Sequence, residues 1–256
     1  MPQQLDAKWI RISVYYVVAL GFSALARLYW HTSDLADPQH GIWAMYWHLV
    51  SGIGPFIGAV VIWAAFRPEN RMSFGGTYPA MSFAMLAVPA IVMGVLGIDN
   101  PFSVDPHLFG IHMGVWIALY AILEETGWRG YLQGEFRNHS PLLRYIIVGL
   151  FWYAWHLSYF GHHAVSDEII ALVLLLLASI GIGFVADRTR SVFAAASFHV
   201  IGNIMGLTVD FRTLIPSANT RVIIVLVCVA VWLVMLRLWR MRDTRLGLLP
   251  TGDSPA

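Results

Sequence analysis

Two glutamates and an arginine stand in a stretch that otherwise has the composition of a membrane-spanning helix. The run 124–129 reads Glu-Glu-Thr-Gly-Trp-Arg. An ionised side chain at bilayer depth is costly and usually functional. Glu125 and Arg129 are four residues apart, in the order that favours an intrahelical ion pair. We therefore expect this pair to support a site in which Glu124 does the chemistry.

Two histidines and an asparagine occupy two later apolar stretches. His156 lies in one, and His199 lies four residues before Asn203 in the other, which places these two on one helix face. A carboxylate in a low-dielectric cavity can accept a proton from water and return it to a leaving amine. Glu124 is our candidate for this base.

The histidines allow two kinds of water activation. They can orient a water molecule and stabilise an oxyanion, or they can join Glu124 as ligands of a divalent metal such as zinc. Asn203 would add an amide donor to the oxyanion. The soluble zinc signature His-Glu-x-x-His is absent, so the spacing leaves metal-bound and metal-free water both open.

Composition predicts the class of protein that must hold these residues. The chain is 58% hydrophobic and 12% charged, with a mean hydropathy of +0.64, against roughly 45–50% apolar and about 25% charged in soluble domains. We predict an all-α polytopic membrane bundle of about eight transmembrane helices. A net charge of +1 without a basic patch argues against nucleic-acid binding, and the single Cys228 excludes an intrachain disulfide.

A helix needs about 20 apolar residues to cross the hydrocarbon core. Apolar runs of about this length recur along the chain. We divide one membrane domain into N-terminal helices (1–107), a catalytic core (108–210), a C-terminal helix (211–245) and a disordered tail (246–256). The predicted spans are 10–29, 42–66, 79–98, 108–136, 142–160, 169–186, 192–209 and 222–239.

Basic residues orient the predicted bundle. The segments 38–42, 99–107 and 161–168 contain no lysine or arginine, so the positive-inside rule places both termini in the cytoplasm. Arg27, Arg212 and Arg221 depart from this pattern. The residues that define the cytoplasmic side are Lys8, Arg11, Arg67, Arg71, Arg137, Arg144, Arg188, Arg190, Arg237, Arg240, Arg242 and Arg245.

This orientation allows the depths of the candidate residues to be compared. Glu124 is 13 residues from the nearest cytoplasmic arginine, His156 is 12 and His199 is 9. At 1.5 Å per residue the depths are roughly 20, 18 and 14 Å. Three groups from three helices can therefore meet inside the bundle.

Each residue also has a structural interpretation. The Glu125–Arg129 pair suits a latch within one helix, and a single histidine or asparagine suits a hydrogen bond between helices. The prediction of a site therefore depends on their convergence. Three Gly-x-x-x-Gly pairs, at 54/58, 110/114 and 202/206, predict close helix approach within the bundle.

Three segments resemble the motifs of one protease family. Glu124-Glu125-x-x-x-Arg129, continued as Gly-Tyr-Leu, resembles the first motif of the CPBP family, the CAAX proteases and bacteriocin-processing (Abi) proteases. Segment 152–156, Trp-Tyr-Ala-Trp-His, resembles the motif Phe-x-x-x-His, and 197–203 resembles His-x-x-x-Asn. The resemblance covers about residues 108–206. Trp152 stands where the family usually has phenylalanine.

The resemblance implies an eight-helix intramembrane endopeptidase. Members of this family are usually described as metalloproteases, and a metal-independent glutamate mechanism has also been argued for them. The resemblance implies Glu124, His156 and His199 as essential residues, Asn203 as an oxyanion donor, and Glu125 with Arg129 as support. A peptide or membrane-protein substrate follows. The first motif favours a bacterial plasma-membrane member and counts against a prenylated substrate.

Two other functions remain open at this stage. A binding or bacteriocin-immunity protein on the same fold would sequester a peptide without cutting it. A transporter would relay protons through buried glutamate and histidine, although the chain lacks broken-helix repeats. Substrate, metal dependence and oligomeric state do not follow from the sequence.

Overall fold

The computed structural model describes residues 2–32, 49–68, 72–157, 164–206, 215 and 217–247. Throughout these ranges regular structure is helical, which confirms the all-α prediction. The predicted tail falls almost entirely outside them. The helices are α1 (Pro2–Thr32), α3 (Gly54–Phe66), α4 (Pro79–Leu96), α5 (Pro106–Gly127), the π-helix η3 (Trp128–Leu132), α6 (Gln133–Glu135), α7 (Pro141–His156), α8 (Val165–Thr189), α9 (Val192–Met205) and α11 (Ala218–Arg245).

Every predicted span overlaps a helix in the described part of the chain, but the helices differ in length. Within the described ranges, five apolar stretches are long enough to cross a membrane: Ala7–Tyr29, Pro79–Leu96, Pro106–Glu135, Val165–Thr189 and Ala218–Arg245. By contrast, α3, α7 and α9 have 13, 16 and 14 residues, fewer than the roughly 20 that a full span needs. The predicted residues 42–48, 158–160 and 207–209 lie outside the described ranges.

Local sequence explains where the short helices begin and end. Residues 49–52 are helical, the helix breaks at Ile53, and α3 then starts with Pro55 in its first turn, a position that proline favours. Helix α9 ends at Gly206, whose φ of 69° suits a residue without a Cβ. Helix α7 ends at Leu157, which adopts φ 57°.

Small residues bring neighbouring helices into close contact. A Cβ at Gly54 would collide with a backbone carbonyl of α1, and one at Gly110 would collide with the carbonyl of Met93 in α4. Gly114 meets the backbone of Ala90 in the same way. The first two Gly-x-x-x-Gly pairs therefore pack within the chain, as predicted.

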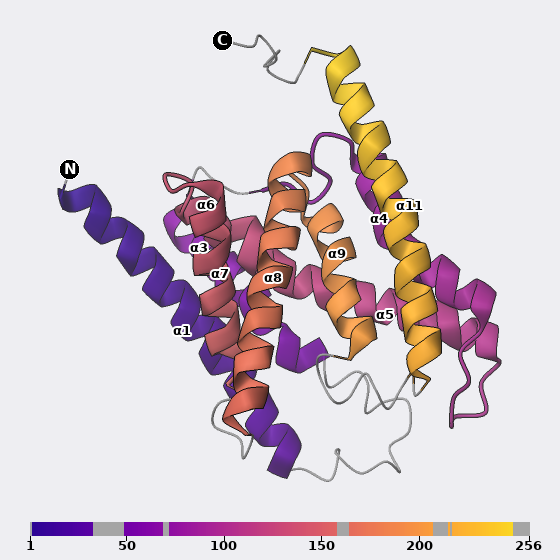
Figure 1. Ribbon diagram of the computed structural model, residues 1–256. Helices are drawn as coiled ribbons and strands as arrows, with labels where there is room; N and C mark the ends of the chain where they lie inside the picture. The colour runs from indigo at the N-terminus through magenta and orange to yellow at the C-terminus, as the bar shows by residue number, and fades with distance from the viewer. Residues whose placement is uncertain are drawn as a thin grey trace.

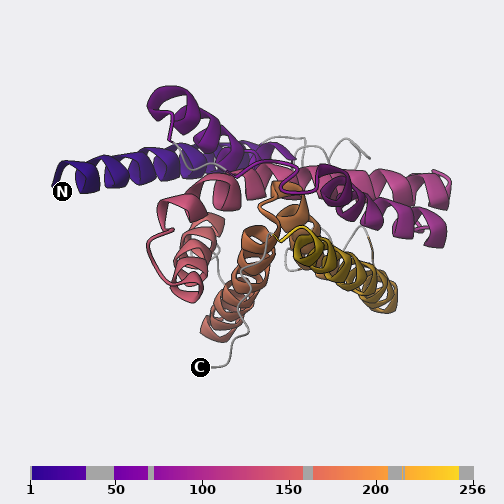
Figure 2. The same cartoon turned by 90° about the horizontal axis from the view of Figure 1, so that it is seen from above.

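Helix α5 runs through the centre of the bundle. It packs against α3, α4 and α9, and Figure 1 shows α8 and α9 in front of it, with α1 and α7 on one side and α11 on the other. The same view places the N-terminal end of α1 and the C-terminal end of α11 on the same side of the molecule. Seen from above, α8 and α11 diverge (Figure 2).

A non-helical segment of bends and turns at residues 72–77 connects three parts of the bundle. Met72 N donates to Gly130 O at 3.0 Å, and Thr77 N donates to Thr189 O at 3.2 Å. Val192 N in turn donates to Ser73 O at 3.0 Å, which satisfies a first-turn amide of α9. The segment thus joins the π-helix to the α8–α9 turn.

Candidate active site

The carboxylates lie where α5 changes its helical winding. Glu124 and Glu125 lie in the last turn of α5, and Arg129 lies in the π-helix that follows. All three side chains are buried. Single π-turns in α-helices often mark functional sites.

Glu125 and Arg129 form the predicted ion pair. Arg129 Nη1 donates to Glu125 Oε1 at 2.8 Å, and both side chains are fully buried. The same oxygen lies 2.6 Å from His199 Nδ1. Arg129 Nη2 also donates to Ser179 Oγ at 3.1 Å. One carboxylate and one guanidinium therefore connect α5, α8 and α9.

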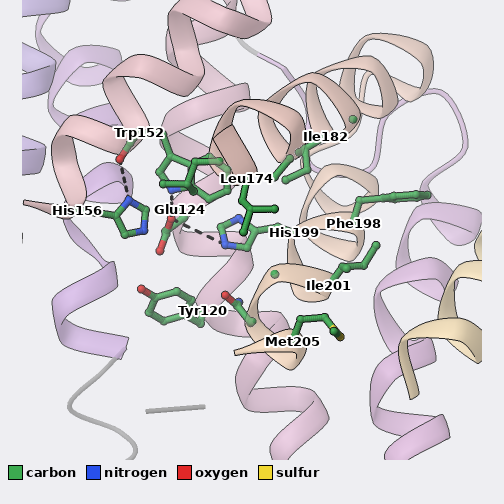
Figure 3. Close-up of a pocket in the computed structure, with 15 residues that line it drawn as sticks. Tyr120, Glu124, Trp152, His156, Leu174, Ile182, Phe198, His199, Ile201 and Met205 are labelled. Atoms are coloured by element: carbon green, nitrogen blue, oxygen red, sulfur yellow. Dashed lines mark hydrogen bonds and ion pairs between the residues drawn. The ribbon is translucent and has the colours of Figure 1, made fainter. Parts of the chain in front are cut away.

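Glu124 lies between Trp152 and His199 (Figure 3). Trp152 Nε1 donates to Glu124 Oε2 at 2.8 Å. His199 Nε2 is 3.9 Å from that oxygen, too far for a direct hydrogen bond. The ring centroids of Trp152 and His199 are 5.0 Å apart. The carboxylate thus faces one donor and one imidazole nitrogen.

Backbone contacts orient His156 at the end of α7. Its Nδ1 lies 2.8 Å from Trp152 O, and since a carbonyl can only accept, Nδ1 carries the proton. Arg27 Nη1 donates to the carbonyls of Trp155 and His156 at 2.9 and 3.2 Å, with its Cζ 4.2 Å from the Trp155 ring. Arg27, an exception to the charge pattern, therefore caps the helix that carries His156.

A cavity of about 450 Å³ contains the predicted residues. Glu124, His156, His199 and Asn203 all border it, so the structure brings together four residues from three helices. Leu174 of α8 and Met205 of α9 are both partly exposed and mark its opening. The other lining residues are Tyr120, Trp152, Leu175, Ala178, Gly181, Ile182, Phe198, Ile201 and Gly202.

Asn203 offers an unused donor to this cavity. Its side chain is buried, and its Nδ2 has no hydrogen-bond partner within the described part of the chain. A buried amide donor without a partner is uncommon in folded proteins. The atom is therefore available to a group that enters the cavity.

Glu124, His156 and His199 are residue types that commonly bind divalent metals. His156 and His199 both engage Nδ1 with an oxygen acceptor, the arrangement that usually orients a metal-ligating histidine. Their Nε2 atoms therefore carry the lone pairs that could bind a metal, alongside the carboxylate of Glu124. Among the residues described, however, no three His, Cys, Asp or Glu side chains are gathered closely enough to hold an ion.

Three contributors to the site are not among the residues predicted from the sequence. Trp152 differs from the motif only by an aromatic exchange, although its i, i+4 spacing to His156 places both on one helix face. Arg27 departs from the positive-inside pattern, which does not by itself indicate a helix cap. Ser179 gave no signal, because its role depends on how α8 packs against α5.

Comparison with known proteins finds one family that matches part of the chain. Residues 106–205 match the family described as Type II CAAX prenyl endopeptidase Rce1-like. The match covers less than half of the chain, so it shows a similarity to this family of CAAX endopeptidases. This similarity and the five apolar helices of membrane-spanning length together support an integral membrane protein. No curated protein and no solved structure matches the chain.

Proposed function

We propose that this Rce1-like protein is an intramembrane endopeptidase in which Glu124 activates water for attack on a peptide bond. The observation that carries the proposal is the burial of Glu124 beside His199 in a cavity that His156 and Asn203 also border. This juxtaposition supplies a base, two imidazoles and an amide donor within one water-restricted volume. General-base catalysis needs such groups within hydrogen-bond reach, directly or through one water molecule.

The gap between Glu124 and His199 suits a bound water. A molecule that makes two hydrogen bonds of about 2.8 Å at roughly a right angle spans about 4 Å, close to the 3.9 Å between Oε2 and Nε2. His199 directs Nδ1 toward Glu125, so in its neutral form Nε2 can accept from that water. Glu124 removes the proton as the water oxygen bonds to the substrate carbonyl carbon.

The second half of the reaction returns the proton. The carbonyl oxygen gains negative charge, and Asn203 Nδ2 donates a hydrogen bond to it, as oxyanion donors do. The carbon–nitrogen bond then breaks, and Glu124 delivers its proton to the leaving amine. One water is consumed and two termini appear, so atoms and charge balance.

A divalent metal held by Glu124, His156 and His199 would supply a Lewis acid and a more acidic water. The Nδ1 contacts of both histidines leave the Nε2 lone pairs as ligands for such an ion, and the three side chains would have to move closer together to share it. Metal analysis of the purified native chain and of His156→Ala, together with chelation and zinc readdition, separates the metal-bound from the metal-free mechanism.

The cavity favours a peptide that reaches the site from within the bilayer. Most of the side chains that line it are apolar, and its opening lies between α8 and α9. We propose a peptide or membrane-protein substrate and a bacterial plasma membrane as the location, with both termini in the cytoplasm. The placement of the α1 and α11 ends on one side of the molecule supports that topology.

Terminal proteomics tests the proposal directly. Membranes carrying the native chain are compared with membranes carrying Glu124→Gln. Glu168→Gln serves as the matched control, because Glu168 is a half-buried glutamate that accepts from Tyr153 Oη and lies outside the cavity. We expect peptide termini that appear with the native chain and with Glu168→Gln but not with Glu124→Gln. Retained cleavage in a folded Glu124→Gln variant would overturn the mechanism. If Glu124→Gln still protects cells against a bacteriocin as well as the native chain does, a protein that binds the peptide without cutting it is favoured.

A further inference from the structure

Trp152 differs in one chemical group from the phenylalanine that its motif usually carries. Its indole adds a single N–H, which can donate but cannot accept. In this chain that N–H lies 2.8 Å from Glu124 Oε2. We propose that Trp152 is a positioning residue of the reaction, whose indole N–H fixes the Glu124 carboxylate toward the cavity. This inference rests on the proposed role of Glu124.

The surroundings of Trp152 hold the donor still. The side chain is only 4% exposed. The His199 ring centroid lies 5.0 Å from its ring centroid, and the Arg129 guanidinium carbon lies 5.0 Å from the ring. A donor fixed before the substrate arrives needs no reorganisation during the reaction. Packing thus converts an ordinary indole into a preorganised donor.

The contact also makes the two oxygens of Glu124 unequal. Figure 3 shows the carboxylate joined on one side to Trp152 and directed toward His199 on the other. Rotation about the last side-chain bond would exchange the oxygens, and a rigid donor on Oε2 opposes that exchange. The lone pairs that are not used by the indole therefore keep a constant direction relative to the cavity.

Another tryptophan provides a matched control. Trp232 in α11 is also fully buried and donates its indole N–H at 2.8 Å, but its acceptor is Met85 O. It does not border the cavity. Trp152→Phe and Trp232→Phe therefore each remove one buried indole hydrogen bond of equal length. Only the first removal involves Glu124.

The kinetic test compares these variants on a quenched fluorescent peptide that carries the cleavage sequence found by terminal proteomics with the native chain. We expect Trp152→Phe to lower kcat about 10- to 100-fold, the range for losing a hydrogen bond to a charged group. We expect KM, and kcat of Trp232→Phe, to stay within about twofold. Benzothienylalanine at position 152, which replaces the N–H by sulfur, should reproduce the loss, whereas 5-fluorotryptophan should restore native kcat.

Equal kcat for the native chain and the benzothienylalanine variant would overturn the proposal, as would equal losses in Trp152→Phe and Trp232→Phe.

A second measurement does not depend on activity. The indole ¹⁵N–¹H resonance of Trp152, assigned by its loss in Trp152→Phe, should move in Glu124→Gln while that of Trp232 stays. If the Trp152 indole resonance does not move in Glu124→Gln, the contact between Trp152 and Glu124 is refuted. If the resonance moves but the native chain cleaves no peptide, the proposed peptidase function is refuted and the contact is retained.

Discussion

Glu125 Oε1 lies 2.6 Å from His199 Nδ1, a contact between residues 74 apart in the chain. The same oxygen accepts from Arg129. The charge of this carboxylate is therefore shared between a guanidinium and an imidazole, both of which are buried. The orientation of His199 consequently depends on an ion pair that lies one residue away from the candidate base.

Glu125→Gln should be strongly destabilising, because it leaves the Arg129 charge buried without a carboxylate. We expect the free energy of unfolding to fall by about 3–5 kcal/mol, with loss of peptidase activity because His199 loses a charged acceptor. Unfolding in detergent measures the first effect. Glu135→Gln removes the Arg11 pair, in which the arginine is 25% exposed, and should cost about 1 kcal/mol or less. Equal losses of unfolding free energy in Glu125→Gln and Glu135→Gln would contradict the assignment of Glu125 as the buried partner of Arg129.

Asn203→Leu should separate stability from activity. Asn203 Nδ2 has no partner within the described residues, so its removal sacrifices no hydrogen bond from that atom. We expect unfolding to be unchanged or to shift to higher temperature, while kcat falls about 100- to 1,000-fold, as for a lost oxyanion donor. The measurement pairs thermal unfolding with peptide cleavage. A variant that unfolds earlier and keeps its kcat would assign Asn203 to packing.

Gly127→Ala should disturb the end of α5. A Cβ at this position would lie 2.5 Å from both Pro55 O and Tyr15 Oη, so α5 would have to move away from α1 and α3. We expect a lower unfolding temperature and reduced cleavage. Gly21→Ala is the control, because its Cβ would meet nothing within 4 Å and alanine favours a helix by about 1 kcal/mol. Equal behaviour of the two variants would refute the packing account.

Arg27→Leu should loosen the last turn of α7. The carbonyls of Trp155 and His156 lose their donor, which should cost about 1–3 kcal/mol. We expect faster hydrogen exchange at the end of α7 and lower kcat, while exchange in α11 stays unchanged. Arg27→Lys keeps the charge and should show a smaller change. Unaltered exchange in α7 with the leucine variant would show that the cap is dispensable.

Local spacing was sufficient to predict part of this site. The Glu125–Arg129 pair follows from the helical repeat alone, and the meeting of Glu124, His156 and His199 follows from counting residues to the basic helix ends. Ser179 and the π-helix were not predictable in this way. Their roles depend on how distant helices pack, and a packing contact between residues 50 apart has no periodic signature.

The fold was predicted to a similar extent. Apolar runs located the helices, because burial in a bilayer demands continuous hydrophobicity. The break at Ile53 and the short lengths of α7 and α9 were not foreseen, since proline and left-handed terminal residues end these helices inside apolar sequence. The segment 72–77 contains no hydrophobic pattern, and its contacts are made by backbone groups, so sequence patterning alone did not reveal them.

The hydrogen bond from Arg129 to Ser179 has a mechanical consequence. Ser179 belongs to α8, the helix that also supplies Leu174 at the opening of the cavity. A substrate that displaces this wall must therefore stretch a contact to the guanidinium that holds Glu125. The entry of a peptide would for that reason alter the charges around Glu124 and Glu125, because the wall of the cavity and the Glu125–Arg129 pair would be displaced together.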